Sequence, residues 1–393
     1  MIFPVKLRKI GAMKIRTLFL DQGETLGGAE RFLIDFLSSL SSTEQHIIFP
    51  VIAGARLPEY RQKMPPGIEI VDFKFPQVRG NFFQKIFITF RLFRAAHDLV
   101  SLTKKLAATQ VFANTPRTMF VLWIAKKFFF LRARTLVMIH DFTVPQFLLK
   151  KIGAAVDVVI VNSIPTRQVV REILPEKFHS KIRIVENGVD FEKIPAAIVP
   201  EKIQNVMLLG RIDPHKGQKF AVEVADLLAE RNPELQFFIV GSPFFLDART
   251  VEYEKEIRKF ATDRELPNVH FIPEVEDPFV EFLKSDLVLA LSTEPETFGR
   301  IVTEALACGK LVIAFDQTGP REILKNFENF CGNSVPSLLV EPNNAMSLAE
   351  KIGFFADNPD AAKKFTAHAR EFIEKKYPLS ETRKRFLNVL SEK

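Results

Sequence analysis

The segment PETFGRIVTEALACG, at 295–309, restricts the fold of this 393-residue chain more than any other part of it. An apolar run, DLVLALS at 286–292, precedes it, and a second run, LVIAF at 311–315, follows it. Runs of this length bounded by turn residues are typical of buried parallel strands. Between them, apolar residues recur at helical spacing from Phe298 to Cys308. The segment therefore predicts a strand, a loop and a helix, with the loop at the carboxyl edge of a parallel sheet, where open α/β folds bind ligands.

The first turn of this predicted helix has the properties of an anion site. Its backbone N–H groups have no partner within the helix, and the helix dipole places partial positive charge there. We expect four residues to line the site: Phe298, Gly299, Arg300 and Ile301. Glu296 precedes the helix and Glu304 lies about two turns into it, so two acceptor carboxylates flank the anion. Such a site fits a phosphate between two sets of hydroxyls, as in a nucleotide sugar, although a solvated helix with ordinary surface glutamates has the same spacing.

A second strand–loop–helix segment, MLLGRIDPHKGQKFAVEVADLL at 207–228, carries two basic residues at its loop. Arg211 follows the predicted strand, and Lys216 opens the predicted helix. The planar fork of an arginine and the point charge of a lysine both suit phosphate oxygens. Solvated surface residues are the alternative for either residue alone. Together at one strand-to-helix junction, they predict a site for a diphosphate.

With these segments the chain resembles the retaining glycosyltransferases of family 4, which have the GT-B fold. Five segments carry the resemblance in the expected order: LGGAER (26–31), ENGVD (186–190), GRIDPHKG (210–217), ETFGRIVTE (296–304) and TGPREIL (318–324). Thr297 stands where a glycine is common in that family, and Thr318-Gly319 replaces Gly-Gly. Neither departure removes a charged group.

The resemblance implies an α/β fold of two Rossmann-like βαβ domains that face a central cleft, with a C-terminal helix that crosses back to the N-terminal domain. Further apolar runs agree with it and predict strands at 14–20, 46–52, 110–114, 135–140, 156–163, 206–210, 237–241 and 269–273. The alternation restarts after a stretch at 194–203 that contains proline and alanine, which indicates two domains. We expect an acceptor-binding domain at 1–192, a nucleotide-sugar-binding domain at 204–377 and the crossover helix at 378–393.

The resemblance also implies roles for single residues in the second domain. Arg211 and Lys216 stabilise the charge that builds on the departing diphosphate. Glu304 holds the ribose hydroxyls. Glu296 binds the hydroxyls of the sugar and orients its anomeric carbon.

In the first domain, His140 ends a predicted strand, and the resemblance implies that it contacts the donor sugar. A lone histidine at a strand end is often only a structural group, so that alternative stays open. Gly27 and Gly28 lie in the first strand-to-helix loop, where they bring the backbone close to the acceptor or to the departing phosphate.

The implied activity is transfer of a hexose-type sugar from a nucleoside-diphosphate sugar to an acceptor hydroxyl with retention of configuration. We expect no cofactor and no metal, because positive groups take the place of a divalent ion and the sequence has no Asp-x-Asp motif. A nucleotide-sugar epimerase and a non-catalytic glycosyltransferase-like subunit have the same fold and stay open as alternatives. Gly23, Gly27 and Gly28 do not match G-x-G-x-x-G, which argues against an NAD-dependent oxidoreductase.

Charge is divided unevenly along the chain: residues 1–192 carry a net +12 and residues 193–393 a net −5. Positive charge gathers with phenylalanine at 81–105, which predicts a basic amphipathic helix. Its apolar stripe is predicted to hold Phe82, Ile86, Phe90, Phe93 and His97, beside Lys85, Arg91 and Arg94. Such a helix is typical of an element that binds an anionic membrane surface, although a core-facing helix with a solvated basic rim has the same pattern. We expect a glycan or lipid-linked acceptor at such a surface, and no nucleic acid, because no nucleic-acid-binding motif accompanies the charge.

Cellular location follows from cysteine use and hydropathy. Cys308 and Cys331 are the only cysteines and lack metal-ligand spacing, which indicates a reducing compartment. The best candidate for a membrane span, 119–131, is short and broken by two lysines. The N-terminus lacks a signal-peptide core, and a predicted strand follows Met13, which makes Met13 an alternative start to Met1. We expect a cytoplasmic protein that is peripheral on the inner face of the plasma membrane.

Overall fold

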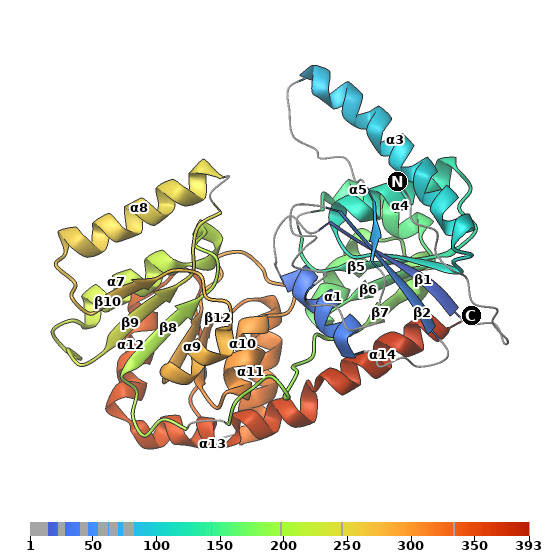
Figure 1. Cartoon of the computed structure of the whole chain (residues 1–393). Coiled ribbons are helices and arrows are strands. Elements are labelled where there is room, and N and C mark those ends of the chain that lie inside the picture. The colour runs from blue at the N-terminus through green and yellow to red at the C-terminus, as the bar shows by residue number, and fades with distance from the viewer. Residues whose placement is uncertain are drawn as a thin grey trace. The chain divides into compact units, whose positions relative to one another are not determined.

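The structure is a computed structural model that describes residues 15–22, 28–39, 46–53, 62, 70–73, 82–142, 144–196, 199–244, 247–332 and 335–392. The chain divides into two compact units. Unit 1 comprises Met1–Val161, Val169–Val185 and Arg383–Lys393, and unit 2 comprises Asn162–Gln168 and Glu186–Thr382 (Figure 1). Each unit has a parallel sheet with helices packed on it, so the predicted fold class of two βαβ units is confirmed.

Unit 1 has a seven-stranded sheet in the order β3-β2-β1-β4-β5-β6-β7. In that order the strands are β3 (Val71–Asp72), β2 (His46–Ala53), β1 (Ile15–Gln22), β4 (Gln110–Ala113), β5 (Arg134–Ile139), β6 (Val158–Val161) and β7 (Ile182–Ile184). β1 pairs in parallel with β2 on one side and with β4 on the other. The strand order therefore changes direction between β1 and β4, and open α/β sheets bind ligands at the carboxyl ends of strands at such a point.

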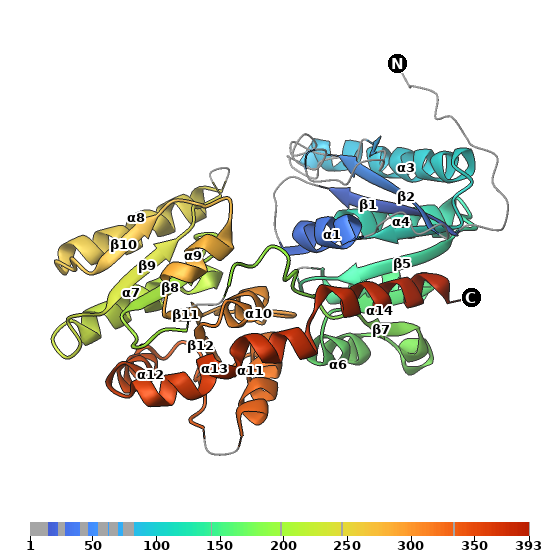
Figure 2. The same ribbon diagram turned by 60° about the horizontal axis from the view of Figure 1, so that its bottom comes forward.

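Helices cover both faces of the unit 1 sheet (Figure 2). They are α1 (Gly28–Ser39), α3 (Phe82–Lys105), α4 (Pro116–Phe128), α5 (Gln146–Ala155), α6 (Ile164–Ile173), which extends into unit 2, and the 3₁₀ helix η1 (Glu176–Lys181). Leu18 and Leu20 of β1 lie in one apolar core with residues of α3, α4 and α5. Phe19, between them, lies in a second core with residues of α1. Successive side chains of a strand point to opposite faces, which is why β1 is apolar at consecutive positions.

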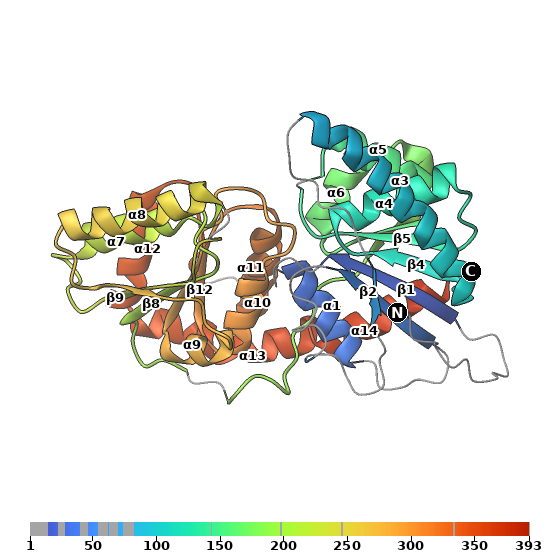
Figure 3. The same cartoon turned by 45° about the horizontal axis from the view of Figure 1, so that its top comes forward.

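Unit 2 has a six-stranded parallel sheet in the order β10-β9-β8-β11-β12-β13. In that order the strands are β10 (Val269–Ile272), β9 (Gln236–Val240), β8 (Asn205–Leu209), β11 (Leu287–Ala290), β12 (Leu311–Phe315) and β13 (Leu339–Val340). Its helices are η2 (Pro214–Lys216), α7 (Gln218–Leu228), α8 (Ala248–Asp263), α9 (Pro278–Lys284), α10 (Arg300–Ala307), α11 (Thr318–Cys331), α12 (Ala345–Asp357) and α13 (Pro359–Lys376). Helix α7 packs against α12, and α10 packs against α11 and α13 (Figure 3). The strand order changes direction between β8 and β11, so the ligand-binding edge of this unit is expected there.

The last helix, α14 (Leu379–Ser391), returns to the first sheet, because Arg383–Lys393 belongs to unit 1. The Phe386 ring fits among the rings of Phe19, Phe36 and Phe112. The Gln110 side chain donates to the Leu390 carbonyl at the helix end. The predicted C-terminal helix that crosses back to the N-terminal domain is therefore present.

Helix α3 buries a face other than the stripe through Phe90 and His97. Both of these side chains are exposed, Phe90 by 69%, which argues against the alternative of a core-facing stripe at these two positions. The buried face instead holds Ile88, Leu92, Ala95, Ala96 and Leu99. Small alanines and branched aliphatic side chains fill this face, whereas Phe93 is half-buried at its border and Phe90 is left outside. The side chains of Phe82, Lys85 and Ile86 lie outside the described residues.

Among the described residues, none of the helices combines the length and the apolar character that a membrane span needs.

Candidate functional site

The candidate site lies at the carboxyl edge of the unit 2 sheet, where β8 and β11 are neighbours. Because these two strands are parallel, the loops that follow them emerge side by side. The two loops are also joined directly, since the Thr293 N–H donates to the His215 carbonyl across 2.9 Å. Residues about eighty positions apart in the sequence are thereby brought to one place.

Lys216 and Glu296 meet at this junction. The Lys216 ammonium donates to the Glu296 carboxylate in a very short ion pair, and the Ser292 hydroxyl donates to the same carboxylate oxygen. The two side chains are 38% and 23% exposed, so the pair is partly withdrawn from water. Burial alone raises the pKa of Glu296, but the charge and hydrogen bond of Lys216, with the hydroxyl of Ser292, hold that pKa below its ordinary value. The carboxylate is therefore ionised at neutral pH.

Gly217 makes this pairing possible. It precedes α7 with φ +72°, in the left-handed region that favours glycine. A Cβ at Gly217 would lie 2.1 Å from the Leu291 carbonyl oxygen, closer than atoms can approach. Only glycine therefore allows the loop that carries Lys216 to lie directly on the end of β11.

Arg211 lies at the end of β8, with a side chain that is 54% exposed. Its guanidinium lies 3.3 Å from the carboxylate of Asp213. Asp213 is buried and also accepts from the His215 N–H, which caps η2. The His215 ring nitrogen Nδ1 in turn lies 3.0 Å from the Glu294 carboxylate.

Helix α10 begins at Arg300, two residues later than the helical spacing predicts. Gly299, with φ +100°, precedes it in the N-cap position. The Arg300 guanidinium donates twice to one oxygen of the Glu304 carboxylate, at 3.1 and 2.9 Å. Glu304 is buried, so it is fixed by a charged partner one helical turn away.

The loop before α10 is held by the start of α11. The Gly319 N–H and the Thr318 hydroxyl both donate to the Glu296 carbonyl. A Cβ at Gly319 would lie 2.3 Å from the Phe298 carbonyl oxygen, so the two segments are in backbone contact. The TGPREIL segment thus fixes the backbone that presents the Glu296 side chain.

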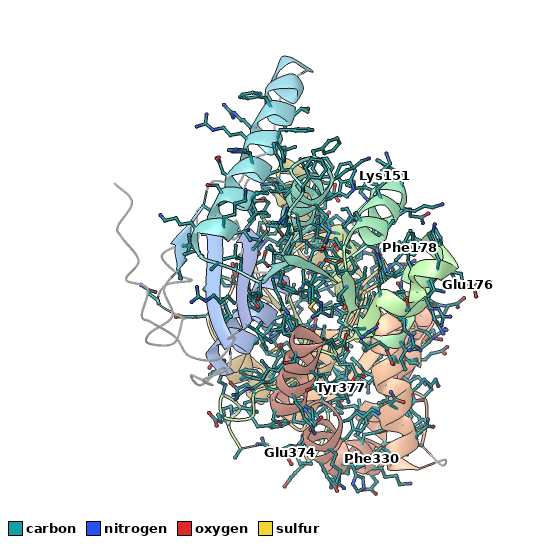
Figure 4. All side chains as sticks on the ribbon, turned by 90° about the vertical axis from the view of Figure 1, so that its right-hand side faces the viewer. Lys151, Glu176, Phe178, Phe330, Glu374 and Tyr377 are labelled. Atoms are coloured by element: carbon teal, nitrogen blue, oxygen red, sulfur yellow. The ribbon has the colours of Figure 1, made fainter. Side chains whose placement is uncertain are left out.

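Two of the predicted ligand-binding residues contribute backbone rather than side chain to this edge. The Phe298 ring is buried and packs edge-on against Tyr377, which is labelled in Figure 4. Ile301 is half-buried against the same apolar core. Their backbone groups remain part of the loop and the first helical turn beside Glu296.

His140, a predicted residue of unit 1, lies at the carboxyl end of β5, next to Asn114 at the carboxyl end of β4. The His140 ring nitrogen Nε2 lies 2.7 Å from the Asn114 side-chain oxygen, and the ring packs against Phe32. A small hollow in this place is lined by Asn114, Pro116, Met119, Ile139, His140, Asp141 and Val144. It combines an apolar floor with three polar side chains. Gly28 is the first residue of α1, and Gly27 lies outside the described residues.

Several residues at these places are absent from the sequence-based prediction. They are Ser292, Asp213 and Asn114. Asn114 directly follows β4, Asp213 directly precedes η2, and Ser292 lies two residues after the end of β11. The sequence could have predicted a helix cap at Asp213, because Asp before Pro is typical of a helix start. The spacing of Ser292 and Asn114 gives no such signal. In the described part of the chain, no cluster of three or more His, Cys, Asp or Glu side chains is arranged as a metal site.

Comparison with known proteins gives family matches over most of the chain. Residues 26–193 match the model of Glycosyltransferase Family 4, and residues 190–372 match the model of Glycosyl transferases group 1. A phosphatidyl-myo-inositol mannosyltransferase of Mycobacterium tuberculosis is 28% identical over 204 residues, which is 50% of each chain. A trehalose synthase of Pyrococcus horikoshii is 28% identical over 196 residues, 49% of this chain and 44% of that protein. The chain thus spans about half the length of the curated relatives it matches.

Solved structures show the same fold over nearly the full chain. Anabaena HepE in complex with UDP and glucose superposes with a TM-score of 0.77 at 22% identity, covering 96% of this chain and 100% of that one. Sucrose-phosphate synthase from Thermosynechococcus elongatus superposes with a TM-score of 0.75 at 17% identity, covering 96% and 98%. Both similarities are those of the GT-B fold.

Proposed function

Because the chain belongs to the glycosyltransferases of group 1 and family 4, we propose that it moves a hexose-type sugar from a nucleoside-diphosphate sugar to an acceptor hydroxyl, with retention of anomeric configuration. The observation that carries the proposal is the Lys216–Glu296 pair at the β8–β11 edge. A cation for a diphosphate and a carboxylate for sugar hydroxyls are held there within one hydrogen bond of each other. The UDP bound by HepE supports a donor of this class.

In this proposal the diphosphate binds between Arg211, Lys216 and the N–H groups at the start of α10. These groups stabilise the negative charge that builds on the leaving diphosphate as the bond to the sugar breaks. Incoming phosphate oxygens compete for Lys216, which frees the Glu296 carboxylate to accept from the sugar hydroxyls. Ser292 keeps that carboxylate in place during the exchange, because it donates to it independently of Lys216.

The remaining predicted residues take the following roles. Glu304, fixed by Arg300, accepts from the ribose hydroxyls. His140 of unit 1 contacts the donor sugar, and Gly27 and Gly28 bring backbone close to the acceptor or the phosphate. Since fixed cations and helix N-termini supply the positive charge, the transfer is proposed to need no divalent metal ion.

We propose a lipid-linked glycan or glycolipid as the acceptor, at the cytoplasmic face of the plasma membrane. The net charge of +12 on residues 1–192 supports attraction to anionic lipid. One relative is a phosphatidyl-myo-inositol mannosyltransferase, which also supports an acceptor of lipid character.

The test is a panel of UDP-, GDP- and ADP-sugars, screened first by thermal shift and then by product analysis. A specific donor raises the melting temperature, because it binds only the folded chain. Incubation of that donor with a membrane-lipid extract should give a glycosylated lipid whose anomeric configuration, read by NMR, equals that of the donor. The transfer should persist in EDTA. Conversion of the donor to its epimer without an acceptor would instead identify an epimerase. A product with inverted anomeric configuration, or no turnover of any donor, would contradict the proposal.

A further inference from the structure

Aromatic side chains on α3, on α4 and directly after α4 form a continuous series of ring contacts. The two helices pack side by side in unit 1 (Figure 1). Six rings contact one another in turn: Phe120, Trp123, Phe128, Phe93, Phe129 and His97. Neighbouring ring centroids lie between 5.2 and 6.1 Å apart. All six side chains are half-buried or exposed. We call this set the aromatic ribbon.

Two more phenylalanines extend the aromatic ribbon into solvent. Phe90, one turn before Phe93 on α3, is 69% exposed, and Phe130, next to Phe129, is 81% exposed. The opposite face of α3 is already buried by aliphatic side chains such as Ile88, Leu92 and Leu99. The ribbon therefore forms the outer rim of the apolar core of unit 1: Phe93, Phe120, Trp123 and Phe129 pack against that core and remain partly exposed. Exposed apolar surface of this extent is typical of an interaction site.

The segment that carries the aromatic ribbon is rich in basic residues, with nine Lys or Arg and a single acid, Asp98, at 88–134. Of these cations, Lys126 is paired with Asp157 and Arg134 with Glu392 within the fold. The Lys127 ammonium lies 5.3 Å from the Trp123 ring centroid and 5.4 Å from that of Phe128, so cation and ring face the same solvent. Arg91 and Arg132, in the same segment, are exposed.

We propose that the aromatic ribbon, with Arg91, Lys127 and Arg132, is the surface by which unit 1 docks on an anionic lipid bilayer. The proposal rests on the proposed function, in which the acceptor is carried by a lipid. Aromatic rings partition into the interfacial layer of a bilayer, and cations beside them attract anionic headgroups. A nucleic-acid groove fits less well, because the rings pack against one another rather than standing apart to receive bases.

Trp123 is the only tryptophan of the chain, so its fluorescence reports on this surface alone. The wild-type protein is mixed with vesicles of phosphatidylglycerol and phosphatidylcholine, and separately with phosphatidylcholine alone. We expect flotation with the anionic vesicles, a shift of Trp123 emission to shorter wavelength, and quenching by brominated lipid. Each of these effects should weaken as salt rises, because surface charge is screened.

Substitutions separate the ribbon from other surfaces. Because each Lys or Arg near an anionic surface contributes roughly five-fold in affinity, the triple variant R91Q/K127Q/R132Q should bind about 100-fold more weakly. The charge-matched control is K255Q/R258Q/K259Q on α8 of unit 2, which should bind like the wild type. F90S/F130S should weaken binding and reduce the emission shift, whereas L227S/M346S, at exposed apolar positions of unit 2, should do neither.

Three results would each overturn the proposed docking surface. They are absence of flotation at low salt, flotation with unchanged Trp123 emission, and equal effects of the ribbon and control variants. Binding of a single-stranded oligonucleotide but not of vesicles would overturn it in favour of nucleic acid. Thermal shift by UDP or GDP is measured in parallel on every variant. If the ribbon variants lose vesicle binding but UDP or GDP still raises their melting temperature, the docking surface is supported. If the wild type binds vesicles but no nucleotide, the proposed function fails and the docking surface is retained.

Discussion

Lys216 and Glu296 form an ion pair at the end of the unit 2 sheet, although 80 positions separate them in the chain. Each is supplied by a loop that follows one of two neighbouring parallel strands. Removing one member of such a partly buried pair leaves the other without a counter-charge. The free-energy cost of that unpaired charge exceeds the stabilisation that the intact pair provides. In the proposed function, a bound diphosphate would supply the counter-charge for Lys216, and sugar hydroxyls would donate hydrogen bonds to Glu296, so that each member of the pair would exchange its partner for a ligand group.

The first prediction concerns the cations of this edge. Lys216→Ala and Arg211→Ala should each lower turnover roughly 30- to 1000-fold, about 2–4 kcal/mol of transition-state stabilisation, because each removes a charge that faces the leaving diphosphate. Steady-state kinetics with the identified donor measures the effect. Lys219→Ala is the matched control, since Lys219 is an exposed lysine on the next helix that pairs with Glu223. Near-wild-type turnover in both site variants, with circular dichroism unchanged, would remove them from the mechanism.

The second prediction separates the two glutamates. Glu304→Gln should weaken binding of the free nucleoside diphosphate, since the ribose loses its charged acceptor. Glu296→Gln should leave that affinity nearly unchanged and lower turnover of the full donor. Isothermal titration calorimetry with the nucleoside diphosphate, followed by kinetics, measures both. An equal loss of nucleotide affinity in the two variants would show that the roles are wrongly divided.

The third prediction is a pH dependence of stability. The pKa of Glu296 is lowered in the folded chain, so its ionised form contributes stability above the ordinary value of 4.5, and that contribution is lost as pH falls through the lowered pKa. The melting temperature of Glu296→Gln should therefore lie below that of the wild type at pH 7, and the gap should close on acidification below pH 4.5. Differential scanning calorimetry at several pH values tests this. A gap that stays constant down to acid pH would mean that the Lys216 pair does not stabilise the fold. Glu374→Gln, in an exposed helix pair with Arg370, should change the melting temperature little at pH 7.

Strand positions could be predicted from the sequence where a strand is buried on both faces. The runs at 286–292 and 311–315 enclose β11 and β12, since continuous apolar runs are what a doubly covered parallel strand requires. Three strands gave no such signal: β3, β7 and β13 are only two or three residues long. All three are edge strands of their sheets. Backbone pairing to one neighbour is enough to form such a strand, and no continuous apolar run is needed. The family resemblance and the α/β fold class are confirmed.

The site could be predicted in its residue types but not in its pairings. Charge and spacing point to Lys216 and Glu296, yet nothing local indicates that they bond to each other, because that contact depends on β8 and β11 being neighbours. The buried face of α3 could not be predicted for the same reason, since it depends on a neighbour that is distant in sequence. Periodicity shows that the helix is amphipathic, but Phe90 and Leu92 are both apolar, and only the fit against α4 decides which of them is buried.

The fourth prediction concerns Arg300, which positions Glu304. Arg300→Met should weaken nucleoside-diphosphate binding roughly ten-fold, the effect of losing one charge-assisted hydrogen bond that orients the carboxylate. Because the two side chains act as one unit, the double variant R300M/E304Q should bind nucleotide no more weakly than E304Q alone. Calorimetry on the single and double variants completes the cycle. Additive losses would show that Arg300 binds the nucleotide directly instead.

The fifth prediction concerns the backbone contact that holds the Glu296 loop. In Gly319→Ala the new Cβ would lie 2.3 Å from the Phe298 carbonyl oxygen, so α11 and the loop must separate. We expect a loss of about 1–3 kcal/mol in the free energy of unfolding, together with loss of turnover, because the displaced loop carries Glu296. Gly353→Ala is the matched control within α12, where the nearest atom to the new Cβ lies 3.4 Å away and alanine favours the helix by about 1 kcal/mol. Urea unfolding and kinetics on both variants decide the matter: if Gly319→Ala is as stable and as active as Gly353→Ala, the start of α11 does not determine where Glu296 lies.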